Sequence, residues 1–186
     1  MHFTIPILAC LAGMSLASPT AIPNDLATRD TIIVDRSLAK AQAALTTLTK
    51  SIDAYFWSPQ RNAATQQRLI TEDAQVVIDA LTQGAQQIST GPTVDRLQKP
   101  TVVVKAKELL DQLRKTNDSW VRAKSLIVGN GGRQAIGDAV RKQANAANSF
   151  ATALVSKMPG GEGEPIAFWY EKEVKQAVQK SVAAFN

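Results

Sequence analysis

The chain has 186 residues, of which 45% are hydrophobic and 5% aromatic, and it carries a formal net charge of +5 at pH 7. This length suits one domain with a sizeable core. The scarcity of aromatic residues, beside abundant Ala and Gln, favours helices over sheets. The basic residues are dispersed along the whole chain, so the positive charge does not indicate a nucleic-acid-binding surface.

The N-terminus has the features of a secretory signal peptide. An apolar run over residues 5–17 ends with small side chains at Ser15 and Ala17, the two positions that a signal peptidase inspects. We therefore expect cleavage before Ser18, a signal peptide over residues 1–17, and a protein that is secreted and extracellular. The run is too short to span a membrane, and no later stretch predicts a transmembrane segment.

Cleavage would remove the chain's single Cys, Cys10, and its single His, His2. The mature protein would then contain no disulfide and none of the side chains used in Ser-His or Cys-His catalysis or preferred by zinc. Residues 18–29 contain two prolines and predict a flexible leader or pro-segment. The remaining residues, 30–186, are expected to form the folded domain.

The stretch over residues 31–57 predicts a long amphipathic helix. Its apolar residues recur at alternating steps of four and three, which is the spacing of one helical face. These residues are Val34, Leu38, Ala41, Leu45, Leu48, Ile52 and Tyr55. At about 1.5 Å per residue the helix would be roughly 40 Å long, and its apolar face must be buried against other parts of the chain.

Four more helices with the same spacing are predicted downstream. They cover residues 61–88, 102–128, 133–158 and 166–185, and residues 93–99 predict a short helical turn before the third helix. Proline and glycine clusters separate them. Because the connections are short, we predict an all-α fold: a single-domain antiparallel bundle of four to five amphipathic helices. A helical solenoid is the alternative, and it would require clearer sequence repeats.

The acidic residues do not form a catalytic or metal-binding pattern. Glu72 and Asp73 are neighbours that diverge on a helix, and Glu162 and Glu164 lie in a glycine-rich loop. We interpret these residues as solvated surface charge and expect no enzymatic activity, no metal and no cofactor. The net positive charge would suit a weak attraction to cell-wall polysaccharide or lipid headgroups, or would serve only to keep the surface soluble.

Two aromatic clusters flank predicted loops, at residues 55–57 and 168–170. Such clusters plug the ends of a core, or they cap a cavity or contact an apolar partner. The sequence Asn117-Asp118-Ser119 is a glycosylation sequon inside the third predicted helix. A sugar on Asn117 requires that this side chain face solvent.

Alanines recur on the inward faces of the predicted helices, including Ala41, Ala74, Ala106 and Ala147. Small side chains either let helices approach closely or leave apolar space between them. Space that persisted would be able to accept an alkyl chain. The sequence alone leaves both outcomes open.

The chain resembles the fungal hydrophobic-surface-binding protein A family, which includes cell-wall galactomannoproteins. The resemblance covers residues 30–185 and follows a secretory start and the pair Arg29-Asp30. It consists of the helix end LTKSIDAY at residues 48–55, the helix end LVSKMP at residues 154–159, and the glycine-rich loop and amphipathic helix that follow.

This resemblance implies a non-enzymatic secreted helical bundle that associates with hydrophobic material. Some family members adsorb to hydrophobic surfaces, and some cell-wall members hold long-chain fatty acids inside the bundle. The chain ends at Phe185-Asn186 without the Ser/Thr-rich stalk and hydrophobic tail of a wall-anchored protein. We therefore expect a freely secreted form, with wall association as the less favoured location.

Two mechanisms follow from this interpretation. In the first, a fatty acid lies between the helices against apolar side chains, for which the candidates are Ile52, Leu81, Leu113, Trp120, Val140, Phe150, Leu154 and Val178. In the second, the bundle loosens at a hydrophobic surface and lays its apolar faces on it. The alternative is a structural or interaction protein of the cell wall or extracellular space, with a fully packed core and no ligand.

Overall fold

The computed structural model describes residues 24–57, 62–160 and 165–186. Within these residues the chain forms five helices and no strand: α1 (Asn24–Trp57), α2 (Ala63–Thr90), α3 (Lys99–Gly129), α4 (Arg133–Ser156) and α5 (Pro165–Phe185). The predicted all-α bundle of amphipathic helices is therefore confirmed. The predicted signal peptide over residues 1–17 lies outside the described residues.

Two helix ends differ from the prediction. The first helix begins at Asn24, so residues 24–29 are helical and not part of a flexible leader. No proline or glycine occurs between Asn24 and Trp57, and nothing local stops the helix from extending in the N-terminal direction. The fourth helix, predicted to reach residue 158, ends at Ser156, because the next two backbone N–H groups, of Lys157 and Met158, donate to carbonyls only three residues before them.

The short helical turn predicted over residues 93–99 is confined to its second half, where the N–H groups of Gln98 and Lys99 both donate to the Asp95 carbonyl at 3.0 Å. The Asp95 carboxylate accepts a hydrogen bond from the Leu97 N–H at 3.0 Å, and this favours a turn over a helix. The Val94 side chain is buried, and its N–H donates to the Lys157 carbonyl at 2.7 Å. This connection is thereby fixed against the end of α4.

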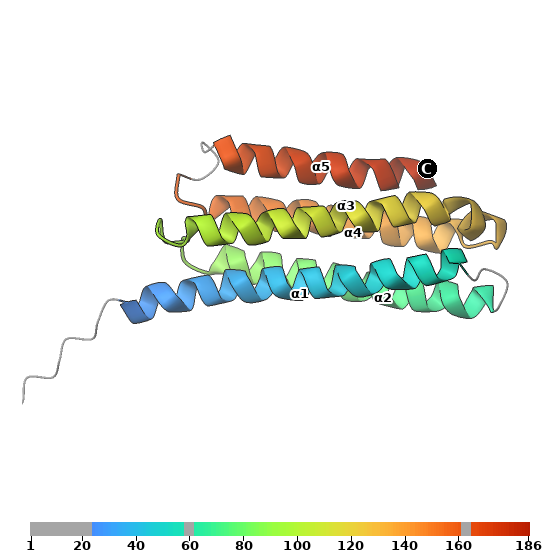
Figure 1. Ribbon diagram of the computed structural model, residues 1–186, viewed down its shortest axis with the longest axis horizontal. Helices are drawn as coiled ribbons and strands as arrows, with labels where there is room; N and C mark the ends of the chain where they lie inside the picture. Colours follow the sequence, from blue (N-terminus) through green and yellow to red (C-terminus); the bar gives the residue numbers. More distant parts are fainter. Residues whose placement is uncertain (1–23, 58–61, 161–164) are drawn as a thin grey trace, which may run out of the picture.

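The helices run alternately up and down, so α3 and α5 point in the same direction and α4 in the opposite one (Figure 1). Around the bundle, α1 packs against α2 and α3, α2 against α4, and α5 against α4 and α3. Helices α3 and α4 barely touch each other, because α5 lies along both of them on the side away from α1 and α2 (Figure 1).

We call the region where α3, α4 and α5 face one another the α5 seam. Helix α5 contributes six buried side chains to it, at steps of three and four: Ala167, Tyr170, Val174, Val178, Ser181 and Phe185. The α5 seam continues into the core formed by the other helices. A fifth helix thus closes a four-helix bundle that would otherwise be open between α3 and α4.

The small residues of the inward faces mostly serve close packing. Ala41, Ala74, Ala106 and Ala147 are all buried in one continuous core. Gly84 of α2 is the tightest position, since a Cβ added there would lie 2.6 Å from the Phe150 ring of α4. These small residues therefore mainly let the helices pack closely, with the exception of the α5 seam, where empty space persists among the described residues.

Candidate functional site

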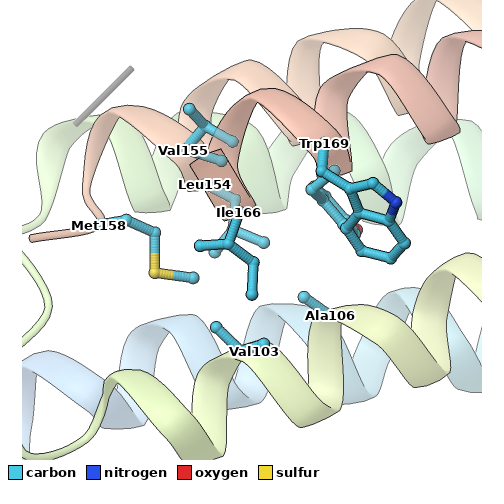
Figure 2. Close-up of a pocket in the computed structure, with 9 residues that line it drawn as sticks. Val103, Ala106, Leu154, Val155, Met158, Ile166 and Trp169 are labelled. Atoms are coloured by element: carbon cyan, nitrogen blue, oxygen red, sulfur yellow. The ribbon is translucent and has the colours of Figure 1, made fainter. Parts of the chain in front are cut away.

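Two small apolar cavities lie in and below the α5 seam. The first has a volume of about 20 Å³ and is at the end of the bundle where α3 and α5 begin and α4 ends. In Figure 2, Val103 and Ala106 of α3 face Leu154, Ile166 and Met158 across this space, and Trp169 borders one side. Its lining side chains are almost entirely hydrocarbon.

The second cavity has a volume of about 10 Å³ and lies deeper in the bundle. All five helices contribute to its lining, which consists of Leu45, Leu81, Leu109, Leu110, Leu113, Ala147, Phe150, Tyr170 and Val174. Tyr170 lines both cavities. The two cavities are therefore consecutive spaces along the α5 seam, adjoining one shared side chain.

The cavities are closed to any large ligand in this conformation. A space of 10–15 Å³ on this measure holds about one water molecule, and an apolar space of that size stays dry. A long alkyl chain would therefore need α5 to move away from α3 and α4. The cavities mark where the packing is least complete and hence where separation would cost the least dispersion energy.

Tyr170 is the polar exception in this apolar region. Its side chain is 6% exposed, and its hydroxyl is the only side-chain oxygen among the residues that line the two cavities. No described residue forms a hydrogen bond with it. Burial raises the pKa of the Tyr170 phenol above its ordinary value of 10.0, because the charged form is poorly solvated there. The hydroxyl therefore stays protonated at neutral pH.

Tyr55, near the end of α1, is the contrasting case. Its hydroxyl donates to the Leu126 carbonyl at 3.2 Å and accepts from Gln67 Nε2 at 3.1 Å and from Asn130 Nδ2 at 2.8 Å. A buried tyrosine hydroxyl usually finds such partners. The hydroxyl of Tyr170, by contrast, has no partner among the described residues, and it is not one of the fully buried unpartnered atoms, so it retains contact with solvent.

A polar layer crosses the α5 seam beyond the second cavity. Trp120 Nε1 donates to Gln143 Oε1 at 3.3 Å, and the Ser181 hydroxyl donates to Asn117 Oδ1 at 2.8 Å. The ring of Trp120 meets the ring of Phe185 edge to face, with centroids 6.0 Å apart. The side-chain nitrogens of Asn117 and Gln143 are buried and have no hydrogen-bond partner. This layer ends the wholly apolar part of the α5 seam.

Ion pairs join α5 to α3 along the outer edge of the α5 seam. Arg114 pairs with Glu173, and Lys180 Nζ lies 2.7 Å from Asp118 Oδ1. All four side chains are partly or largely exposed to solvent. Exposed pairs of this kind contribute little to stability and weaken with salt. They restrain α5 without locking it.

The eight side chains predicted to contact a lipid are all buried in the core. Leu154 lines the first cavity, while Leu81, Leu113 and Phe150 line the second. Ile52, Trp120, Val140 and Val178 line neither cavity, although Trp120 belongs to the polar layer. The structure therefore brings four of the eight to the cavities.

The most informative residue of the candidate site was missing from that set. Tyr170 was predicted only as part of the aromatic cluster at residues 168–170. Periodicity could not single it out, because every inward position of a helix carries the same signal. The available clue was its hydroxyl, because the neighbouring inward positions of this helix carry aliphatic side chains.

The two aromatic clusters lie at opposite ends of the bundle and do not form one site (Figure 1). In each cluster the tyrosine points into the core, while Trp57 is 76% exposed and Phe168 is 67% exposed. The Phe56 and Trp57 rings contact each other edge to face, with centroids 5.1 Å apart. Each cluster thus both plugs the core and presents apolar surface.

Asn117 is 2% exposed, and its side-chain oxygen accepts the hydrogen bond from Ser181. The folded chain therefore has no room for a glycan on Asn117, and the sequon is not a glycosylation site of this conformation. The reason is its helical position: Asn117 lies on the face of α3 that packs against α5.

The described acidic side chains mostly pair with basic groups or hydroxyls. Glu72 forms an ion pair with Arg68 at 3.3 Å, and Asp73 accepts a hydrogen bond from Ser51 at 2.5 Å. Within residues 24–57, 62–160 and 165–186, no three His, Cys, Asp or Glu side chains are grouped so that they could hold a metal ion. Glu162 and Glu164 lie outside these ranges. In the same ranges no helix has the length and hydropathy of a membrane-spanning segment.

Comparison with known proteins relates this fold to fungal proteins. No protein-family model matches the chain. In sequence, the chain is 25% identical over 118 residues to cell wall mannoprotein 1 of Talaromyces marneffei, which is 63% of this chain and 25% of that protein. The chain therefore spans about a quarter of the length of this relative.

In structure, the chain is similar to ligand binding domain 1 of the Penicillium marneffei MP1 protein, which was solved in complex with arachidonic acids. The TM-score is 0.75 at 25% identity, over 85% of this chain and 99% of that domain. Ligand binding domain 2 of the same protein, complexed with multiple arachidonic acids, gives a TM-score of 0.71 at 17% identity, over 84% of this chain and 96% of that domain.

AFMP4P in complex with palmitic acid gives a TM-score of 0.74 at 12% identity, over 84% of this chain and 99% of that one. For this structure at 12% identity and for ligand binding domain 2 at 17% identity, the likeness establishes the fold alone. The expected resemblance to a fungal cell-wall mannoprotein is confirmed: the chain is similar in sequence to cell wall mannoprotein 1 and has the fold of the ligand-binding domains of MP1.

Proposed function

We propose that this protein is a secreted, non-enzymatic carrier that binds a long-chain fatty acid in the α5 seam. The observation that supports this most strongly is the pair of consecutive apolar cavities where α5 bridges α3 and α4. They occur in a fold for which similar structures were solved in complex with arachidonic or palmitic acid.

Binding requires α5 to move, since the cavities of about 20 and 10 Å³ are far smaller than an alkyl chain. Helix α5 packs mainly on α3 and α4, so it can separate from them while the α1, α2, α3 and α4 contacts persist. Each methylene that enters the α5 seam would contribute about 0.8 kcal/mol. A long chain could thus offset the cost of opening and of ordering the ligand.

The length of the α5 seam suits a long acyl chain. The stretch of α5 between Tyr170 and Ser181 is about 16 Å long, at about 1.5 Å per helical residue. One leaflet of a bilayer has a hydrocarbon thickness of about 15 Å, half of the roughly 30 Å core. A membrane-length acyl chain would therefore fit between the first cavity and the polar layer.

The proposed location is the extracellular space, with cell-wall association as a further proposal. Support comes from the signal-peptide features of residues 1–17 and from the cell-wall mannoprotein to which the chain is similar. A protein that holds a fatty acid inside a helical bundle outside the cell would keep that lipid soluble.

Native mass spectrometry tests the proposed function. The secreted protein is stripped of lipid, incubated with palmitate, and weighed without denaturation. We expect a mass increase of one or more palmitate molecules. A matched pair of variants locates the binding: Ala106→Leu fills the first cavity and should reduce the bound fraction, whereas Ala135→Leu, on the exposed surface of α4, should not. An unchanged apo mass at saturating palmitate would reject the proposal.

A second function, adsorption to hydrophobic surfaces, is favoured by a separate observation. Three large apolar side chains are exposed at the end of the bundle where α3 and α5 begin: Leu97 at 87%, Val104 at 57% and Phe168 at 67%. Apolar surface of this kind promotes contact with hydrophobic material.

Binding to octyl-coated beads would test this second function. Leu97→Ser with Phe168→Ser should reduce adsorption, and high salt should leave it largely unchanged because apolar contact is not screened. The control is Trp57→Ser, an exposed apolar residue at the opposite end. Equal adsorption of the double variant and the unchanged protein would rule out this surface.

A further inference from the structure

The hydroxyl of Tyr170 has no partner within the described part of the protein. Tyr170 lies between two apolar cavities, and no described residue donates to or accepts from its hydroxyl. The residue is 6% exposed, and its hydroxyl is not among the fully buried side-chain atoms that lack a partner, so the oxygen keeps contact with solvent. The hydroxyl is therefore a polar group at the boundary between the apolar α5 seam and water, and its hydrogen-bonding capacity is not used by the fold.

We propose that the Tyr170 hydroxyl donates a hydrogen bond to the carboxylate of the bound fatty acid and so fixes the position and direction of the ligand. This inference rests on the proposed function, since it concerns the same α5 seam. It assigns the head group to the first cavity, where α3 and α5 begin, and the alkyl chain to the space below Tyr170.

The surroundings of Tyr170 support this direction. On one side lies the first cavity, bordered by Trp169, which is 38% exposed, so a head group there can retain contact with solvent. On the other side lie the leucines of the second cavity, which suit an alkyl chain. The polar layer of Asn117, Gln143 and Ser181 lies beyond them and would stop the methyl end.

The chemistry of the donor also fits. No Lys or Arg lines either cavity, so a carboxylate in the α5 seam would depend on a neutral donor. Because burial raises the pKa of the phenol, Tyr170 remains a donor at neutral pH. A hydrogen bond from a hydroxyl to an ionised carboxylate is stronger than one between neutral groups.

The experiment compares Tyr170→Phe with the unchanged protein, using two probes, palmitate and methyl palmitate. The substitution keeps the ring and removes the oxygen. We expect palmitate affinity to fall about tenfold to a hundredfold, because a hydrogen bond to a charged group is lost. Affinity for the methyl ester, which offers only a neutral carbonyl, should fall by less than about tenfold.

Tyr55→Phe is the matched control. It also removes a phenolic oxygen, but at the opposite end of the core and from a hydrogen-bonded network. It should lower the melting temperature and leave the preference for palmitate over its ester unchanged. Tyr170→Phe should keep or raise the melting temperature, because no hydrogen bond of the ligand-free fold is lost.

The outcomes separate the two proposals. If the unchanged protein binds palmitate and Tyr170→Phe binds it equally well, Tyr170 is not the head-group ligand, while the proposed function stands. If Gln143→Leu lowers palmitate affinity selectively and Tyr170→Phe does not, the fatty acid lies in the reverse direction and the inference is overturned. If the unchanged protein binds neither probe, the proposed function itself fails.

Discussion

The contact between Gly84 of α2 and Phe150 of α4 predicts that Gly84→Ala destabilises the protein. A Cβ at residue 84 would lie 2.6 Å from Phe150 Cε2, 3.1 Å from Phe150 Cδ2 and 3.3 Å from the Ser37 Cβ. Replacing Gly by Ala inside a helix ordinarily stabilises by about 1 kcal/mol. Overpacking of a filled core costs about 1–3 kcal/mol, so here we expect the unfavourable effect to prevail.

Gly137→Ala is the control for this substitution. Gly137 is also a buried helical glycine, but its added Cβ would meet its nearest neighbour, Phe185 Cβ, at 3.5 Å, which is an ordinary contact. This variant should be more stable than the unchanged protein by about 1 kcal/mol. Urea denaturation should therefore show Gly84→Ala to be less stable than Gly137→Ala by about 2 kcal/mol, with equal slopes.

The same substitution should affect ligand binding. The Phe150 ring lines the second cavity. A Cβ at residue 84 would push this ring into the space proposed for the alkyl chain, and palmitate affinity should therefore fall. Combining Gly84→Ala with Phe150→Leu should recover part of the lost stability, since the shorter side chain removes the close contact. Equal stability of Gly84→Ala and Gly137→Ala would refute this account of the α2–α4 packing.

Three further predictions concern the α5 seam. Replacing Arg114 and Lys180 together by Ala should speed palmitate uptake in a stopped-flow experiment, because it removes ion pairs that hold α5 to α3; an unchanged rate would mean that α5 does not open along this edge. The intact mass of protein secreted from a glycosylating host should show no glycan on Asn117, since the residue is buried, and a glycan there would contradict the packing of α3 on α5. The pKa of Tyr170 is higher in the folded protein than its unfolded value of 10.0, so its contribution to stability is present below pH 10 and is lost as the pH rises further, by up to about 1.4 kcal/mol per pH unit. Tyr170→Phe should therefore lose stability less steeply above pH 10. Parallel stability curves for the variant and the unchanged protein would refute this prediction.

The helices could be predicted because each one shows the same local pattern. Val34, Leu38, Leu45 and Ile52 fall on one face at steps of four and seven residues, and all are buried. Burial of an amphipathic face is a local consequence of spacing. Helix ends were less predictable where no proline or glycine marked them, as at Asn24.

The candidate site could be predicted only in part, because it depends on which helices meet. The spacing of inward residues does not show that α5 bridges α3 and α4, so Trp120 and Leu154 were equally good candidates. The volume of a cavity is also a small difference between the space that the helices enclose and the space that their side chains fill, and the sequence does not determine that difference. Similarly, the burial of Asn117 depends on its register against Ser181 of α5.

The central claim is that the alkyl chain lies inside the α5 seam, and tryptophan quenching tests it most directly. The chain has three tryptophans, Trp57, Trp120 and Trp169. Trp120 is buried in the polar layer at the far end of the α5 seam, and Trp57 is exposed at the end of α1. Variants that keep one of these two tryptophans are titrated with palmitate brominated near its methyl end. The account predicts strong quenching of Trp120 and little quenching of Trp57. Quenching of Trp57 with Trp120 unaffected would place the ligand on the outside of the bundle and contradict the account.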